Sequence, residues 1–251
     1  MTETYGIHDV SVRPIVSGGA RLSIPVRIVG IDKEANEVRF FGKIVGSADS
    51  ISASTIHLFK NLFLESGGLE PLFRVGDSAE QMVRHQHETV EAIRSAGVPT
   101  ARSYGYYHLD QDVWIVISEY IVGLPLSITR SITDEQMDDV FGYVQRMHRA
   151  GVYHGDIKAE NILIGDRIYF VDVGDFADSS TKEQKEAYDL ASLTGSLSEF
   201  RSPESVVATA RRHFSPKALA EATQYLDLVQ TRPDTSFANE IKEKLMRLMR
   251  R

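Results

Sequence analysis

The sequence has no cysteine among its 251 residues, and this absence excludes disulfide bonds, thiolate metal sites and cysteine nucleophiles. Long apolar runs are also missing: the most apolar short stretch, residues 113–117, is far too short to span a bilayer. The first residues lack the basic start and apolar core of a secretory signal. From these absences we expect a cytoplasmic protein without a membrane span.

A surplus of basic residues is missing as well, since the formal net charge is −7. This balance gives no overall attraction for nucleic acid or acidic membranes, although it leaves room for a local basic patch. The composition, 42% apolar and 25% charged, is that of an ordinary globular protein. A chain of this length suits one large domain or two modest lobes around a shared cleft.

The first half of the chain alternates between strand-like and helical patterns. Runs rich in β-branched and aromatic residues predict strands at 10–16, 21–31, 38–45, 101–109 and 113–121. Apolar spacing predicts a short helix near 53–64 and a longer one over 78–96. We therefore expect an antiparallel five-stranded sheet with one main helix.

The second half is predominantly helical. A capping-box pattern at Thr133 opens a helix that ends at Gly151. Further helices are expected near 181–199, 202–213, 216–230 and 237–250. The predicted fold class is α+β, with a β-rich lobe over residues 1–122, a helical lobe over 123–251 and a ligand cleft where they join.

Polar residues concentrate in one stretch, "HGDIKAENILIGDRIYFVDVG", residues 154–174. Asp156 is suited to orient a hydroxyl group and accept its proton, and the amide of Asn161 is suited to ligate a divalent cation. Lys158 would neutralise a transferring phosphoryl group. Taken alone, this spacing also fits a surface turn with capping Asp and Asn residues.

Asp172 favours the chemical interpretation over the surface turn. The pattern predicts a hairpin between Asn161 and Asp172, and a hairpin brings its two ends together. Two oxygen donors held in this way suit Mg²⁺, which binds few carboxylates and keeps water and phosphate oxygens as its other ligands.

The motifs "HGDIKAEN" and "VDVG" resemble the catalytic loop and the metal-binding triplet of the protein-kinase-like superfamily. Gly155 is similar to the glycine of RIO-type kinases, the KEOPS-complex kinase, and aminoglycoside and lipopolysaccharide phosphotransferases. Lys158 looks more like the Ser/Thr protein kinases. The resemblance implies a two-lobed kinase-like fold that uses ATP with Mg²⁺ or Mn²⁺, in which Asn161 and Asp172 hold the metal.

The resemblance also calls for a strand lysine that holds the α- and β-phosphates of the nucleotide. Lys43 on the third predicted strand fits this role better than Lys60, which lies in a segment with helical spacing. Between the first two strands, Ser17, Gly18 and Gly19 would cover the phosphates, although on their own they read as a hairpin turn.

Two further parts of the expected site come from the same resemblance. The resemblance calls for an acidic partner of the strand lysine. Counting back from "AGVP" places this position at Gln86, which is not acidic, and Glu88 is the alternative. The backbone from Glu119 to Ile121 would hydrogen-bond adenine, and Ile117 would flank the adenine pocket.

After "DVG" the sequence has no A-P-E triplet and no long activation segment, and Asp189 in "YDLASL" would brace the catalytic loop. The favoured function is an atypical, RIO-like Ser/Thr protein kinase that also phosphorylates itself. A small-molecule kinase and a nucleotide-binding module without turnover remain open. Expected partners are ATP and a hydroxyl acceptor, nucleic acid is not indicated, and the oligomeric state is not predicted.

Overall fold

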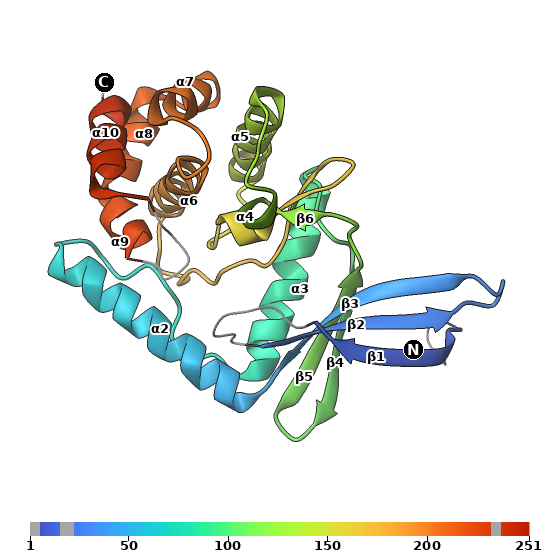
Figure 1. Ribbon diagram of the computed structural model, residues 1–251. Helices are drawn as coiled ribbons and strands as arrows, with labels where there is room; N and C mark the ends of the chain where they lie inside the picture. Colours follow the sequence, from blue (N-terminus) through green and yellow to red (C-terminus); the bar gives the residue numbers. More distant parts are fainter. Residues whose placement is uncertain (1–5, 16–22, 232–236, 251) are drawn as a thin grey trace.

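The computed structural model describes residues 6–15, 23–231 and 237–250, and in it a five-stranded sheet faces a mostly helical part (Figure 1). All strands of the sheet are antiparallel, in the order β1-β2-β3-β5-β4. The bounds are β1 His8–Pro14, β2 Ile24–Ile31, β3 Glu37–Val45, β4 Ser103–Asp110 and β5 Val113–Glu119. The two-lobed fold class is confirmed, whereas the lobe boundary between residues 122 and 123 stays a prediction.

Apolar clusters lie on both faces of this sheet, because side chains alternate between faces along each strand. One face carries a cluster that includes Ile28, Phe40 and Ile117. On the other face Val45 and Val116 pack against Val83 of α3 (Ala79–Ser95). Helix α3 thus fixes the side of the sheet that faces the rest of the site.

Helix α3 was predicted from its apolar spacing and its bounds agree with the structure. Ser78 caps its N-terminus in a capping box with Gln81. The chain leaves the helix through Gly97, whose φ of +74° is readily adopted only by a residue without a side chain. The buried side chains of Val83, Val90 and Ile93 lie on one face, as the spacing indicated.

Helix α2 is longer than the predicted 53–64 helix and spans Ser47–Ser66. It begins earlier because the carboxylate of Asp49 accepts a hydrogen bond from the backbone N–H of Gly46, at 2.7 Å, which caps the first turn. On its inner side, the buried side chain of Asn61 accepts from the N–H groups of Leu72 and Phe73, at 3.0 and 2.9 Å, and donates to the carbonyl of Phe73 at 2.8 Å. Asn61 therefore holds the connection to α3 in place.

The helical part follows the predicted order with one correction. Its elements are α4 Leu126–Thr129, α5 Asp134–Arg149, α6 Lys182–Leu197, α7 Pro203–His213, α8 Pro216–Ala222, α9 Leu226–Gln230 and α10 Asn239–Met249. The predicted 216–230 helix is interrupted by a 3-10 turn, η2 Thr223–Tyr225, where the hydroxyl of Thr223 bonds the carbonyl of Ala220 at 2.7 Å. Within the described ranges, every helix is too short or too polar to cross a bilayer.

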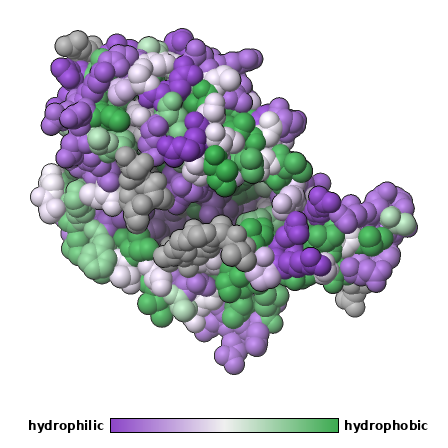
Figure 2. All heavy atoms as spheres, in the orientation of Figure 1, coloured by the Kyte–Doolittle hydropathy of each residue, from purple (hydrophilic) through white to green (hydrophobic). Residues whose placement is uncertain are grey.

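A small sheet connects the two parts. It contains β6 Leu124–Pro125, β7 Ile162–Ile164 and β8 Ile168–Phe170, preceded by the 3-10 turn η1 Ala159–Asn161. Strands β7 and β8 form the hairpin that the sequence predicted. Beneath it, α6 is buried over most of its length within the main core, and the surface between the two parts is hollowed and mainly hydrophilic (Figure 2).

Replacing Asn61 with Leu tests the anchor of the α2–α3 connection. The variant leaves two backbone N–H groups and one carbonyl without partners, so we expect a loss of roughly 3 kcal/mol in the free energy of unfolding. Urea denaturation measures this loss. Thr55→Ala, at an exposed position of the same helix, is the control, and equal stability of the two variants would contradict the anchoring role.

Candidate active site

The amide of Asn161 joins the two acids of the predicted site. Its Nδ2 donates to the backbone carbonyl of Asp156 at 2.8 Å, to the Asp156 carboxylate at 3.0 Å and to the backbone carbonyl of Asp172 at 3.1 Å. Because all three partners only accept hydrogen bonds, the network assigns the nitrogen to this side of the amide and its oxygen to the other. The hairpin therefore brings Asn161 and Asp172 together as the sequence indicated.

Each acid is paired with a lysine. The Nζ of Lys158 lies 3.1 Å from the Asp156 carboxylate, within the same loop. Lys43 comes from β3 on the far side of the site and forms an ion pair with Asp172. The alternative lysine, Lys60, lies on α2 with its Nζ 4.6 Å from the ring centre of Phe73. Lys43 is therefore the strand lysine that reaches the acidic cluster.

Two glycines press the catalytic loop against the segment after β8. The N–H of Gly174 donates to the carbonyl of His154 at 2.8 Å. A Cβ on Gly174 would lie 2.5 Å from the carbonyl oxygen of Gly155, closer than packed atoms approach. Gly155 itself has a φ of +75°, in the region that favours glycine. This contact explains the glycine that follows His154.

Asp189 on α6 holds the catalytic loop from below, as expected. Its fully buried carboxylate accepts from the backbone N–H groups of His154 and Gly155, at 2.8 and 2.9 Å, and lies 3.2 Å from Nε2 of His148. Burial holds the pKa of His154 below its usual value, so its ring is neutral. The ring accepts the N–H of Asp156 on Nδ1 at 3.3 Å, a structural role.

The expectation that Gln86 or Glu88 is the partner of Lys43 is corrected by the structure. Within the described part of the chain, Lys43 contacts Asp172 and neither of these residues, and Glu88 is exposed. Gln86 lies on the inward face of α3 between buried Val83 and Val90, and the partner that Lys43 contacts is the carboxylate of Asp172. The ion pair expected between α3 and β3 is thus replaced by one within the site.

Helix α3 contacts the site through His85 instead. Its Nε2 lies 2.9 Å from the carbonyl oxygen of Gly174 and 3.6 Å from the carboxylate of Asp175. Burial lowers the pKa of His85, and the neutral ring donates one hydrogen bond to the Gly174 carbonyl. Sequence reasoning missed this residue because the helical period places position 85 beside, and not on, the apolar stripe.

The predicted adenine-binding segment follows β5. The N–H of Glu119 donates to the carbonyl of Arg102 at 2.8 Å and is thus already used, whereas within the described ranges no hydrogen bond of the Ile121 N–H occurs. Ile117 does not flank the pocket: it pairs with Gly42 and packs in the cluster on the face opposite Lys43. Ser118, which pairs with Phe41, lies on the same face of the sheet as Lys43. Ser17, Gly18 and Gly19 lie outside the described residues.

Asp175 is a site residue that sequence reasoning missed. Burial and the neighbouring carboxyl group of Asp77 raise the pKa of Asp175 to about 8. The Nε of Arg74 lies 3.5 Å from its carboxyl group, and the guanidinium of Arg74 also pairs with Asp178 at 2.6 Å. The segment after the glycine pair is thereby tied to the α2–α3 connection. Only the tertiary contacts of residues 72–77 reveal this burial.

The donor atoms near Asn161 and Asp172 fit a magnesium ion. An amide oxygen and a carboxylate are hard oxygen ligands, and Mg²⁺ takes few such ligands from protein while keeping water and phosphate oxygens. Lys43 now neutralises Asp172 from the sheet side. A bound Mg²⁺–nucleotide would supply the charge that makes a transferring phosphoryl group reactive, and these two side chains would hold it.

Comparison with known proteins places this fold among kinase folds. No protein-family model matches the chain. The chain superposes on a putative fructosamine-3-kinase from Haemophilus somnus with a TM-score of 0.52 at 10% identity, over 99% of this chain and 93% of that one. At this level of identity the likeness shows the fold alone.

Sequence relatives match shorter segments. A probable serine/threonine-protein kinase BUD32 homolog from Archaeoglobus fulgidus is 38% identical over 34% of this chain and 40% of its own length. A probable bifunctional tRNA threonylcarbamoyladenosine biosynthesis protein from Methanosarcina acetivorans is 32% identical over 41% of this chain and 18% of its own length. The chain thus spans less than half of either relative.

The chain has the fold of kinases. Over about a third of its length it is similar to a probable serine/threonine-protein kinase BUD32 homolog.

Replacing Gly174 with Ala tests the contact between the two glycines. The added Cβ would meet the carbonyl of Gly155, so we expect the free energy of unfolding to fall by about 2 kcal/mol and stabilisation by ATP–Mg²⁺ to be lost. Thermal unfolding with and without the nucleotide measures both. Gly67→Ala, where a Cβ meets no atom closer than 3.4 Å, is the control, and wild-type behaviour of Gly174→Ala would contradict the role.

Replacing Asp175 with Asn tests its raised pKa. Since the folded value of about 8 lies above the value of 3.8 for an unperturbed Asp, the stabilisation is complete below pH 4 and is lost as the pH rises through 8. We expect the wild type to lose stability relative to Asp175→Asn across this window, with Tm falling by several degrees. Parallel pH profiles of the two proteins would contradict the prediction.

Proposed function

We propose that the protein is an ATP- and Mg²⁺-dependent phosphotransferase that moves the γ-phosphoryl group of ATP to a hydroxyl group. The observation that carries the proposal is the single network in which Asn161 bonds Asp156 and Asp172 while Lys43 pairs with Asp172. Two acids, an amide and two lysines around one point match the needs of phosphoryl transfer, which depends on positioning and charge stabilisation.

Asp156 orients the acceptor hydroxyl and takes its proton. The Asn161 amide and the Lys158 ammonium fix its carboxylate from two sides, at 3.0 and 3.1 Å, so the base is held in one orientation. Lys158 in turn lies where it can stabilise charge on the transferred group. The proton passes from the hydroxyl oxygen to Asp156 as the oxygen–phosphorus bond forms and ADP leaves.

Asn161 and Asp172 would hold the metal, and Lys43 would hold the α- and β-phosphates. Lys43 and Asp172 are paired with each other, so this pair would open as Asp172 turned to the metal and Lys43 to the phosphates. The N–H of Ile121, in the segment after Glu119, would hydrogen-bond adenine.

A protein hydroxyl is the acceptor favoured here. Lys158 stands where Ser/Thr protein kinases carry lysine, and one sequence relative bears the name of a probable serine/threonine-protein kinase. A small-molecule acceptor is the second candidate. Only residues 175–181 separate Gly174 from α6, and this short segment leaves the acceptor side of the site compact. The structural likeness to a putative fructosamine-3-kinase supports the shared fold alone.

The test is transfer of label from γ-labelled ATP with Mg²⁺, to the protein itself, to a generic protein acceptor and to a panel of sugars. We expect labelled protein, and a fall of about 10²–10⁴-fold in rate for Asp156→Asn, the range that a general base contributes. Asp166→Asn, an exposed acid in the turn of the same hairpin, is the control. Chelation of the metal should abolish transfer by the wild type.

Three outcomes separate the candidates. Label on protein supports a protein kinase, and label on a sugar alone assigns the second candidate. If ATP–Mg²⁺ raises the Tm yet wild type and Asp156→Asn show the same negligible turnover, the chain is a nucleotide-binding module and the proposed activity is wrong.

A further inference from the structure

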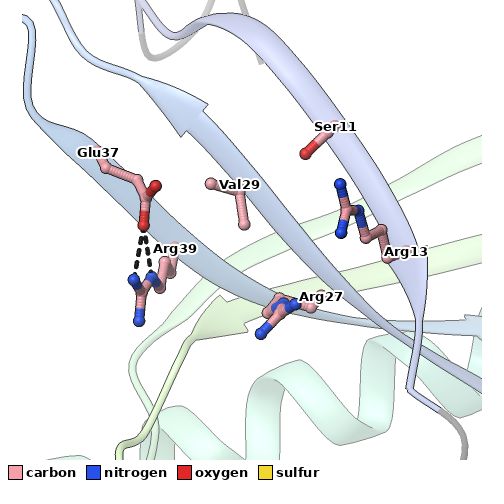
Figure 3. Close-up of a pocket in the computed structure, with 6 residues that line it drawn as sticks. All are labelled: Ser11, Arg13, Arg27, Val29, Glu37 and Arg39. Atoms are coloured by element: carbon pink, nitrogen blue, oxygen red, sulfur yellow. Dashed lines mark hydrogen bonds and ion pairs between the residues drawn. The ribbon is translucent and has the colours of Figure 1, made fainter.

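Three arginines stand in a row on the outer part of the main sheet (Figure 3). Arg13, Arg27 and Arg39 come from β1, β2 and β3, and all are exposed. Arg13 and Arg27 are directly opposite each other in the antiparallel register. Because opposite residues of such a pair point to the same face, their guanidinium groups share one side of the sheet.

The Arg13–Arg27 pair costs stability in isolation, since like charges directly opposite each other repel. Glu37 pairs with Arg39 at 2.7 Å. Among the described residues, the side chains of Arg13 and Arg27 have no hydrogen-bond or ion-pair partner. The chain has 35 acidic residues against 28 basic ones, so acids are plentiful, yet none is placed between these two. A bound anion would turn the repulsion into attraction.

The surface beside the pair is hollowed on both sides. One hollow, of about 330 Å³, is lined by Ser11, Arg13, Arg27, Val29, Glu37 and Arg39. A second, of about 220 Å³, is lined by Arg13, Pro14, Ile15, Arg27 and Tyr120. Both contain Arg13 and Arg27, so a ligand in either hollow meets both guanidinium groups.

The pair also lies on the same face of the sheet as Lys43. Arg27 is opposite Phe41, and Phe41 is two residues from Lys43 on β3, a spacing that returns the side chain to the same face. Tyr120, which lines the second hollow, follows Glu119 in the predicted adenine-binding segment. A ligand held by the arginines would therefore lie along the edge of the proposed nucleotide site.

We propose that Arg13 and Arg27 form a binding site for a phosphate group, flanked by Arg39 and the hydroxyl of Ser11. Guanidinium groups bind phosphate through paired N–H donors in a planar fork, and a phosphate dianion neutralises both charges of the pair. The phosphate belongs to a ligand other than the ATP held by Lys43, so the site goes beyond the proposed function. The shared chemistry covers a small phosphate ester and the phosphodiester of a single nucleic-acid strand.

The test is thermal unfolding of the wild type and of Arg27→Gln, in chloride and in inorganic phosphate at equal ionic strength. We expect phosphate to raise the Tm of the wild type, because a ligand that binds the folded state stabilises it. Arg27→Gln should start at an equal or higher Tm in chloride, since the repulsion is gone, and should need at least ~10-fold more phosphate for the same shift. Arg149→Gln, an exposed arginine on α5, is the matched control and should respond like the wild type.

Two probes then separate the sources. Ribose 5-phosphate binding that weakens in Arg27→Gln assigns the site to a small phosphate ester. For a short single-stranded RNA, the slope of log binding constant against log salt concentration is compared between the two proteins. A slope smaller by about 0.7 in Arg27→Gln, the value for one lost phosphate contact, assigns the site to a phosphodiester.

Equal responses of the wild type and Arg27→Gln to phosphate, ribose 5-phosphate and RNA would overturn the proposal. None of these measurements uses turnover, and Asp156 is unchanged in every protein compared. Failure of the phosphate site is therefore distinguishable from failure of the proposed phosphoryl transfer.

Discussion

The buried carboxylate of Asp189 is the interaction on which the site depends. A fully buried acid is costly unless its oxygens accept hydrogen bonds, and here two consecutive backbone N–H groups, of His154 and Gly155, supply them. These two hydrogen bonds fix the backbone path of the loop that carries Asp156. Asp156 follows directly, and its neighbour Asn161 then bonds the end of the hairpin.

The other contacts around the loop serve the same alignment. The N–H of Gly174 reaches the carbonyl of His154, His85 reaches the carbonyl of Gly174, and so α3, the hairpin and the loop form one hydrogen-bonded chain. Helix α3 is coupled to the site by the neutral ring of His85, which donates a hydrogen bond to the carbonyl of Gly174. The resemblance to kinases had predicted a different link, an acid of this helix paired with Lys43. The ammonium group of Lys43 pairs with Asp172 instead.

What could be predicted from the sequence was whatever local spacing determines. The strands, α3, the capping box of α5 and the β7–β8 hairpin follow from periodicity and turn residues, and the hairpin alone predicts that Asn161 meets Asp172. The partner of Lys43 could not be predicted, because it depends on how the sheet packs on the loop. The burial of Asp175 depends in the same way on the α2–α3 connection, and the Arg13–Arg27 juxtaposition on strand register, where a slip of one residue would turn the side chain to the other face.

The tight apposition of Gly155 and Gly174 also bears on regulation. Many protein kinases are switched on when a phosphorylated activation loop pairs with arginines of the protein, and the resemblance places one such arginine at position 155. Here a Cβ at that position would already meet the backbone of Gly174 at 3.1 Å, and residues 175–181 lead straight into α6. At this position the loop therefore carries a glycine packed against Gly174, and a guanidinium group that could pair with a phosphorylated segment has no room there.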